Sequence, residues 1–129
     1  MDIWEANSIS TAYTLHPCNK QGQYTCSGVE CGDSDQRYQG VCDKDGCDLN
    51  AYRVGVHDFF GPGSNFKINT TRPFSVVTQF ITADGTDHSD IVEVRRGYVQ
   101  DGHYIAHPKS NISGLSTQFD SITDNMCKA

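Results

Sequence analysis

The chain has 129 residues, which allows one ordinary domain or part of a larger one but not two independent cores. Ten Lys and Arg against sixteen Asp and Glu give a net charge of −6, the wrong sign for binding a phosphate backbone, so we expect no nucleic-acid partner. No apolar run approaches the roughly 20 residues of a membrane-spanning helix, so we expect no membrane partner either.

The chain divides into a strand-like start, a cysteine-rich middle and a strand-rich second half. β-branched and aromatic residues alternate loosely over residues 1–15, which predicts a partly buried strand. Residues 18–47 hold five of the six cysteines among Gly, Ser, Asp and Gln, which predicts loops ordered by cross-links. Three further strands are expected, the first of them central: residues 74–82, 91–99 and 103–105. Asp84-Gly85 and Asp101-Gly102 supply the turns between them, so the sequence predicts an all-β antiparallel sandwich or barrel.

The cysteine count and the start of the sequence bear on where the protein works. Six cysteines, an even number, favour disulfides formed outside the cytosol, so we expect a secreted, extracellular protein. The opening Met-Asp-Ile-Trp-Glu lacks the basic and apolar regions of a signal peptide, which favours an internal fragment of a longer protein. Asn69 and Asn111 each begin an Asn-X-Ser/Thr motif and are expected to be glycosylated.

The densest chemical signal is the pair of acidic residues Asp2 and Glu5 on either side of Trp4. Residues three apart on a regular strand face opposite ways, but a bulge between them places both side chains on one face. Two carboxyl groups on a concave sheet face form a plausible sugar-cleaving site. The alternative is that both acids are solvated and flank a core tryptophan.

Three patterns in the sequence could suggest a metal site, but none has the features that such a site requires. Cys26/Cys31 and Cys42/Cys47 are each separated by four residues, but no third pair has zinc-ligand spacing. The stretch 43–46 lacks the spacing and the closing Glu of a calcium loop. His103 and His107 are four apart, but the strand context and Pro108 argue against a helical metal face. We expect no metal and no cofactor.

The segment Met1–Ser8 resembles the active-site signature of glycoside hydrolase family 7 cellulases, Glu-X-Asp-X-X-Glu with a Trp before the last Glu. Further blocks follow in the order of that family: His16-Pro17-Cys18, Arg37-Tyr38, Asp45-Gly46-Cys47-Asp48, Tyr52-Arg53, the stretch Phe60 to Ser64, and the stretch Val76 to Phe80. The resemblance covers nearly the whole chain. It implies that residues 1–129 are an internal fragment of one catalytic domain, a concanavalin-like β-sandwich (jelly roll) with long disulfide-stapled loops.

The resemblance also implies the catalytic roles. Glu5 corresponds to the general acid/base, and Asp2 corresponds to the acid that hydrogen-bonds the nucleophile and tunes its proton affinity. The nucleophile is expected to be a Glu immediately before Met1, outside this sequence. Two carboxylates about 5 Å apart give a retaining double displacement, so the fragment alone is expected to be inactive.

Six substrate-binding residues are implied in the same way. Thr14 and His16 match positions near the leaving-group sugar. The residues that match the product side are Arg37, Asp45, Asp48 and Arg53. Two structural alternatives stay open at this point: Arg53 and Asp48 could form an ion pair, and His16 before Pro17 could be a hydrogen-bonded loop histidine.

The family pattern pairs Cys18 with Cys42, Cys26 with Cys31, and Cys47 with Cys127. The insertion between Cys18 and Cys42 resembles the tunnel-roofing loop of cellobiohydrolases, although its 31–37 segment is about two residues short. We therefore expect a monomeric, secreted cellulose 1,4-β-cellobiosidase that binds cellulose or cello-oligosaccharide chains and releases cellobiose. The alternatives are an endo-β-1,4-glucanase of the same family and a non-catalytic carbohydrate-binding module.

Overall fold

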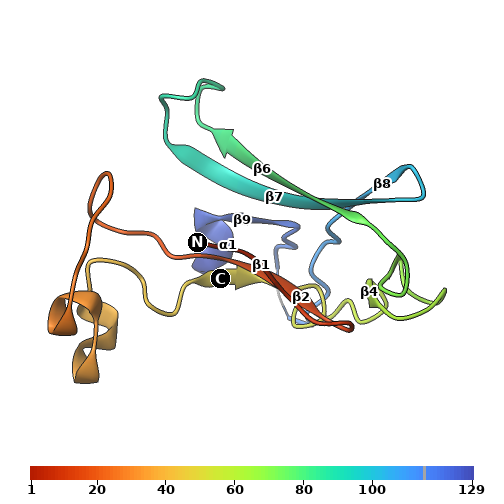
Figure 1. Cartoon of the computed structure of the whole chain (residues 1–129), viewed down its shortest axis with the longest axis horizontal. Helices are drawn as coiled ribbons and strands as arrows, with labels where there is room; N and C mark the ends of the chain where they lie inside the picture. Colours follow the sequence, from red (N-terminus) through yellow and green to blue (C-terminus); the bar gives the residue numbers. More distant parts are fainter. Residues whose placement is uncertain (115) are drawn as a thin grey trace.

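Two antiparallel β-sheets face each other in the computed structural model, which describes residues 1–114 and 116–129. The first sheet has the strand order β1-β2-β3, with β1 (Asp2–Ala6), β2 (Thr11–Leu15) and β3 (Cys47–Leu49). The second sheet contains β6 (Ser75–Thr82), β7 (Ile91–Gln100), β8 (His103–Ala106) and β9 (Ser121–Thr123). β6 and β7 lie across the β1–β2 pair (Figure 1), so the all-β sandwich architecture is confirmed.

The expected meander of three antiparallel strands is present, but its central strand is β7 and not β6, which the sequence predicted. β7 pairs with β6, β8 and β9, whereas β6 pairs only with β7 among the described residues. The reason is length, because the ten residues of β7 pair with β9 near one end and with β8 near the other. Val94, Arg96 and Tyr98, which alternate along β7, are buried and face the first sheet.

The first 15 residues form a hairpin rather than the single expected strand. The side chain of Asn7 accepts hydrogen bonds from the backbone N–H groups of Ile9 and Ser10, at 2.9 and 3.0 Å. An Asn that binds the backbone two and three residues ahead reverses the chain locally. The hairpin places β2 between β1 and β3, which anchors β1 to the core.

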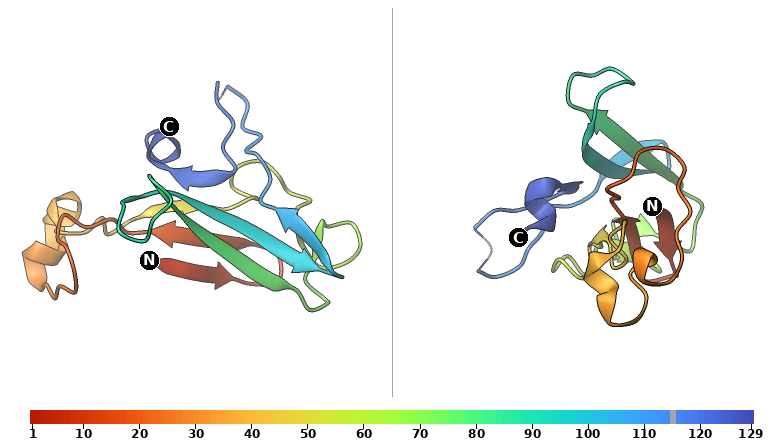
Figure 2. Two further views of the ribbon diagram at one scale, coloured as in Figure 1. Left: turned by 90° about the horizontal axis from the view of Figure 1, so that it is seen from above. Right: turned by 90° about the vertical axis from the view of Figure 1, so that its left-hand side faces the viewer.

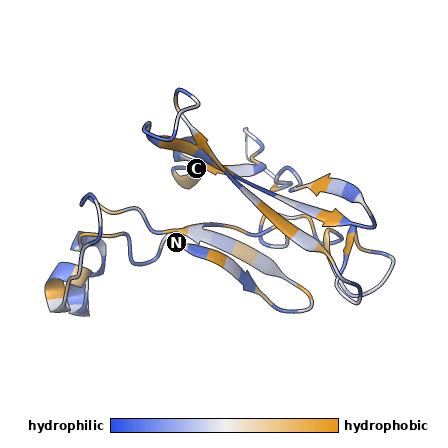
Figure 3. Cartoon of the chain, turned by 45° about the horizontal axis from the view of Figure 1, so that its top comes forward, coloured by the Kyte–Doolittle hydropathy of each residue, from blue (hydrophilic) through white to orange (hydrophobic). Residues whose placement is uncertain are grey.

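The core lies between the two sheets and consists of two groups of side chains. One group contains Phe59, Phe60, Ile68 and Tyr98, and the other contains Tyr13, Leu49, Val94 and Ile122. Phe60 and Ile68 belong to a short parallel pair, β4 (Phe60–Gly61) and β5 (Ile68–Asn69), beside the sandwich. Apolar stretches of β6, β7 and β8 are visible in Figure 3, and several of them extend beyond this core.

The cysteine-rich segment projects from one end of the sandwich (Figure 2). It carries two 3₁₀ helices, η1 (Gly28–Cys31) and η2 (Ser34–Gln39), and it contains the disulfides Cys18–Cys42 and Cys26–Cys31. The third disulfide, Cys47–Cys127, joins β3 to the end of the one-turn helix α1 (Asp124–Cys127). All three pairs are those implied by the family resemblance. Within the described parts of the chain, every helix is too short to traverse a bilayer.

Candidate active site

A bulge in β1 determines which way the two acidic side chains point. Asp2 lies opposite Thr14 and Glu5 lies opposite Ala12, so Ile3 and Trp4 together face the single residue Tyr13. The extra residue shifts the alternation of side chains, so Asp2 and Glu5 line the same cleft. Trp4 points the other way, with its ring centre 6.2 Å from that of Phe60. The predicted bulge, which brings the two carboxyl groups to one face of the strand, is thus present.

The cleft has a volume of about 380 Å³ and is open to solvent. It gathers two of the residues proposed for catalysis and five of the six proposed for substrate binding; its full lining is Asp2, Glu5, Ala12, Thr14, His16, Asp45, Asp48, Asn50 and Arg53. Carboxylates, an imidazole, a hydroxyl and a guanidinium converge from β1, β2, β3 and the loops around β3. Such a surface offers both donors and acceptors to the hydroxyl groups of a sugar.

Glu5 is oriented by its neighbour across the hairpin. The Thr14 hydroxyl, which lies on the buried strand β2, donates a hydrogen bond of 2.8 Å to Glu5 Oε2. The second carboxyl oxygen is in no side-chain hydrogen bond found among the described residues. Glu5 therefore has one carboxyl oxygen held by Thr14 and one to which no side chain of the described residues donates a hydrogen bond.

His16 connects Asp2 to the loop that precedes β3. Its Nε2 lies 2.7 Å from Asp2 Oδ2, and its Nδ1 lies 2.8 Å from the backbone carbonyl of Asp43. The Asp43 carbonyl can only accept, so Nδ1 donates to it, and the contact of Nε2 with the Asp2 carboxyl group favours a proton on that nitrogen as well. The pKa of His16 is accordingly raised, chiefly by the hydrogen bond to Asp2 and next by that to Asp43. His16 is thus a hydrogen-bonded loop histidine, as the alternative held, and one of its two hydrogen bonds also holds Asp2.

The loop carrying Asp43 and Asp45 approaches the site closely because it contains Gly46. Gly46 has a φ of 75°, and a Cβ at this position would lie 2.6 Å from Thr14 Cγ2 and 2.7 Å from His16 Cε1. Only glycine combines this backbone conformation with this lack of space. Gly46 therefore allows His16 and Thr14 to pack beneath the loop.

The four residues expected on the product side form two arginine–aspartate pairs. Arg53 Nη1 donates to both carboxyl oxygens of Asp48, at 2.8 and 2.7 Å, so the ion pair considered as an alternative exists, and both partners also line the cleft. Arg37, on η2, lies outside the cleft lining and donates from Nε to Asp45 at 2.7 Å. This contact lowers the pKa of Asp45 and raises that of Arg37. Arg37 thus contacts the cleft through Asp45.

Asn50 is a cleft residue that the sequence analysis missed. Its Oδ1 accepts hydrogen bonds from the backbone N–H groups of Tyr52 and Arg53, at 2.9 and 3.3 Å. Its Nδ2 donates to the hydroxyl of Ser10 at 3.0 Å. Asn50 therefore positions Arg53 and joins the β1–β2 turn to the loop after β3. An Asn directly after a strand was the available signal for such a turn.

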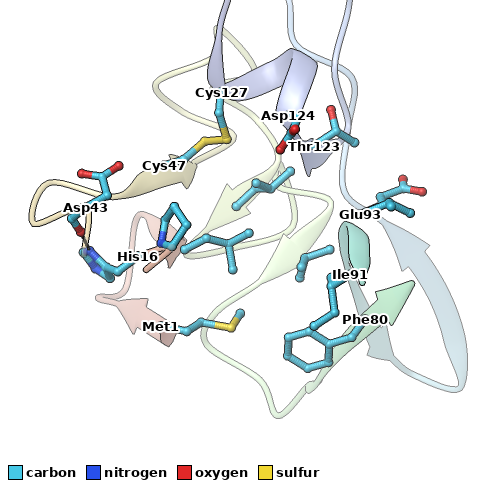
Figure 4. A pocket seen from close by; sticks show the side chains of 15 residues that line it. Met1, His16, Asp43, Cys47, Phe80, Ile91, Glu93, Thr123, Asp124 and Cys127 are labelled. Carbon is cyan, nitrogen blue, oxygen red and sulfur yellow. Dashed lines mark hydrogen bonds between the residues drawn. A yellow bond between two sulfur atoms is a disulfide. The ribbon is translucent and has the colours of Figure 1, made fainter. Parts of the chain in front are cut away.

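A second pocket of about 400 Å³ lies between the sheets and differs from the cleft in chemistry (Figure 4). Met1, Leu15, Phe80 and Ile91 supply much of its lining, beside the Cys47–Cys127 disulfide. Sugar hydroxyls would find few partners there, because most of these side chains neither donate nor accept hydrogen bonds. The polar cleft is therefore the candidate for saccharide chemistry.

The remaining predicted positions lie away from the cleft. Asn69 is half-buried in β5, where its Oδ1 accepts from Gly63, whereas Asn111 is exposed. His107 is buried, and this burial lowers its pKa to about 4, whereas His103 is exposed. No three His, Cys, Asp or Glu side chains come together as a potential metal site within residues 1–114 and 116–129.

The fold and the cleft define an all-β, disulfide-linked protein with a carboxylate-bearing polar site. The chain belongs to glycosyl hydrolase family 7, since the model of that family matches residues 1–129.

Solved structures agree with this assignment. A family 7 cellobiohydrolase from Daphnia pulex is 56% identical, with a TM-score of 0.89 over 98% of this chain and 29% of that one. An endocellulase from Humicola insolens is 44% identical, with a TM-score of 0.83 over 99% of this chain and 30% of that one. An endoglucanase I in complex with cellobiose is 41% identical, with a TM-score of 0.82 over 98% of this chain and 29% of that one. The chain thus spans less than a third of the length of these structures.

Proposed function

We propose that the full-length protein hydrolyses β-1,4-glucosidic bonds in cellulose with retention of configuration and releases cellobiose. The observation that carries the proposal is the placement of Asp2 and Glu5 in one polar cleft, with Glu5 held by Thr14 and Asp2 held by His16. In this proposal residues 1–129 are an internal part of one catalytic domain. The nucleophile is a Glu that precedes Met1.

The reaction has two steps in which Glu5 changes role. In the first step the nucleophile attacks the anomeric carbon, the glycosidic C–O bond breaks, and Glu5 gives its proton to the departing oxygen. In the second step Glu5 removes a proton from water, whose oxygen attacks the anomeric carbon and releases the nucleophile. Asp2, which already accepts a hydrogen bond from His16, offers its other oxygen to the nucleophile.

The molecular surface supports assignment to a larger domain. The accessible area is 8539 Å². A compact monomer of this mass exposes about 6,800 Å², so the excess is roughly a quarter. The large apolar side chains exposed on the strands include Val76 and Phe80 on β6, and Ile91 and Val92 on β7. Partner strands from the rest of the domain would cover these faces.

The loop between Cys18 and Cys42 favours the cellobiohydrolase type. It projects beyond the sandwich, contains η1, η2 and two disulfides, and supplies Arg37 to Asp45 in the cleft region. The greater identity to the Daphnia pulex cellobiohydrolase than to the endocellulases agrees with this choice. The cleft residues Asp45, Asp48 and Arg53, together with Arg37 beside them, would bind the cellobiose product. We also propose that the protein is secreted, monomeric and glycosylated at Asn69 and Asn111.

The proposal is tested by the configuration of the first product. The full-length protein is mixed with cellotetraose, and proton NMR follows the anomeric signals before mutarotation. Retention predicts that β-cellobiose forms first and converts slowly to the α anomer. If α-cellobiose formed first, the double displacement would be wrong, and if no bond were cleaved, hydrolysis itself would be wrong.

An endo-acting cellulase is the second candidate, because endocellulases of this fold are 41–44% identical to the chain. The two modes differ in where new reducing ends accumulate on crystalline cellulose. Release of cellobiose from chain ends predicts mostly soluble reducing ends. Mostly insoluble reducing ends would favour the endoglucanase instead.

A further inference from the structure

Arg96 is a buried cation beneath the β1 bulge. It lies on β7, in the opposite sheet, and is only 2% exposed. Its Nη2 donates a hydrogen bond to the backbone carbonyl of Ile3. Its guanidinium lies 4.4 Å from the ring centre of Tyr13 and 5.6 Å from that of Trp4. One side chain therefore contacts both residues of the bulge and the residue across from them.

These three contacts are located where the strand pairing is irregular. Ile3 and Trp4 share one partner, Tyr13, and a bulge of this kind leaves one residue of the longer strand outside the ladder. The contact of Arg96 with the Ile3 carbonyl is partly buried, so it supplies a charged donor to an oxygen that is partly removed from water. The ring of Tyr13 on β2 lies against the same guanidinium. Arg96 therefore contacts both β1 and β2 at the bulge and stabilises their register.

Stability alone does not account for an arginine at position 96. Its Nε and Nη1 have no hydrogen-bond partner among the described residues, and burial lowers its pKa. An apolar side chain of similar volume fills such a position at a lower desolvation cost. An apolar side chain, however, has no donor for the Ile3 carbonyl. This carbonyl belongs to the bulge between Asp2 and Glu5, which places both acidic side chains on one face.

We propose that Arg96 is a positioning residue for Glu5, acting through the Ile3 carbonyl and the register of the bulge. The inference rests on the proposed function, in which Glu5 protonates the leaving group. Loss of the Arg96 contact allows the strand to relax toward regular alternation, which turns Glu5 away from the glycosidic oxygen. The expected defect is in proton donation rather than in substrate binding.

The test compares two substrates that differ in their need for an acid. Phenyl β-cellobioside has a basic leaving group that requires a proton, whereas 2,4-dinitrophenyl β-cellobioside has a leaving group that departs without one. In the full-length protein, Arg96→Met is expected to lower kcat/KM about 10- to 100-fold on the phenyl substrate and less than about threefold on the dinitrophenyl substrate. The ratio kcat/KM is compared because it reports the first step, in which Glu5 acts as an acid; the second step, in which Glu5 acts as a base, is the same for both substrates. Arg96→Lys, which keeps a donor, is expected to recover part of the lost kcat/KM.

Arg95→Met is the matched control, because Arg95 is the neighbour on β7 and forms an exposed pair with Glu93 at 2.9 and 2.8 Å. It is expected to leave both rates within about twofold. An equal fall on both substrates for Arg96→Met and Arg96→Lys, or unchanged rates, would overturn the positioning role. So would a variant that fails to fold in the Lys form, since the role would then be structural. A wild-type protein that cleaves neither substrate would instead overturn the proposed function.

Discussion

His16 shows how one side chain joins hydrogen bonding, charge and site geometry. Its two ring nitrogens lie against an acceptor-only carbonyl and a carboxylate, and the pKa of the imidazole is raised by these contacts. Titration of the imidazole C2 proton by NMR is expected to give a pKa above 6.5. Asp2→Asn removes the main cause, so this pKa is expected to fall. An unchanged pKa in the Asp2→Asn variant would show that the contact is absent in solution.

The same contact predicts how stability depends on pH. Because the folded protein binds the His16 proton more tightly than the unfolded chain, the contact contributes its full stability below pH 6.5 and loses it as the pH rises through the folded pKa. The difference in free energy of unfolding between wild type and His16→Asn is therefore expected to shrink from pH 5.5 to pH 9. Urea unfolding of the full-length protein and its variant at several pH values measures this difference. A difference that grows with pH would contradict the assignment.

Thr14 is expected to affect catalysis through Glu5. Thr14→Val keeps the shape but removes the donor that holds Glu5 Oε2 at 2.8 Å. We expect kcat on phenyl β-cellobioside to fall about tenfold, because general acid catalysis depends on a fixed carboxyl. Thr70→Val is a control, since Thr70 donates to the Ser8 carbonyl and lies outside the cleft lining. Equal effects of the two substitutions would show that Thr14 has no special role.

At the level of the strands, the local sequence pattern predicted where strands form better than it predicted which strands pair. The sequence predicted the strands β6, β7 and β8 and the Gly-containing turns between them. It also pointed to the bulge, because Asp2 and Glu5 could not otherwise share a face. The prediction that residues 74–82 form the central strand was wrong, because the pairing of strands depends on residues distant in sequence. Arg96 was missed for a related reason: an arginine in a strand is typical of a solvated face, and only the packing of β7 against β1 shows it buried.

The two disulfides outside the Cys18–Cys42 pair are expected to have different effects. Cys47–Cys127 closes a separation of 80 residues and Cys26–Cys31 one of 5. Loss of the longer link by Cys47→Ala with Cys127→Ala is expected to lower the free energy of unfolding by about 4 kcal/mol, and loss of the shorter one by Cys26→Ala with Cys31→Ala by about 2 kcal/mol. Chemical denaturation of the full-length variants measures both. A larger loss from the shorter link would contradict the loop-closure argument.

The whole molecule exposes more surface than a compact monomer of its mass, and the apolar side chains of Val76, Phe80 and Ile91 account for part of it. We therefore expect residues 1–129 expressed alone to unfold broadly and to bind a hydrophobic dye, whereas the full-length protein unfolds cooperatively. Calorimetry and dye fluorescence make the comparison. A sharp, cooperative transition of the isolated chain without dye binding would show that its faces need no further strands.

The account depends most directly on Glu5 as the acid/base of a hydrolytic cleft. In the full-length protein, Glu5→Gln is expected to lower kcat on phenyl β-cellobioside by at least about 100-fold. Binding of cellotetraose, measured by calorimetry, is expected to stay within a few-fold of wild type. Glu30→Gln, in the projecting loop, serves as the control. Unchanged hydrolysis by Glu5→Gln would contradict the catalytic role of Glu5, and a wild-type protein that binds cellotetraose but cleaves no substrate would identify a carbohydrate-binding module instead.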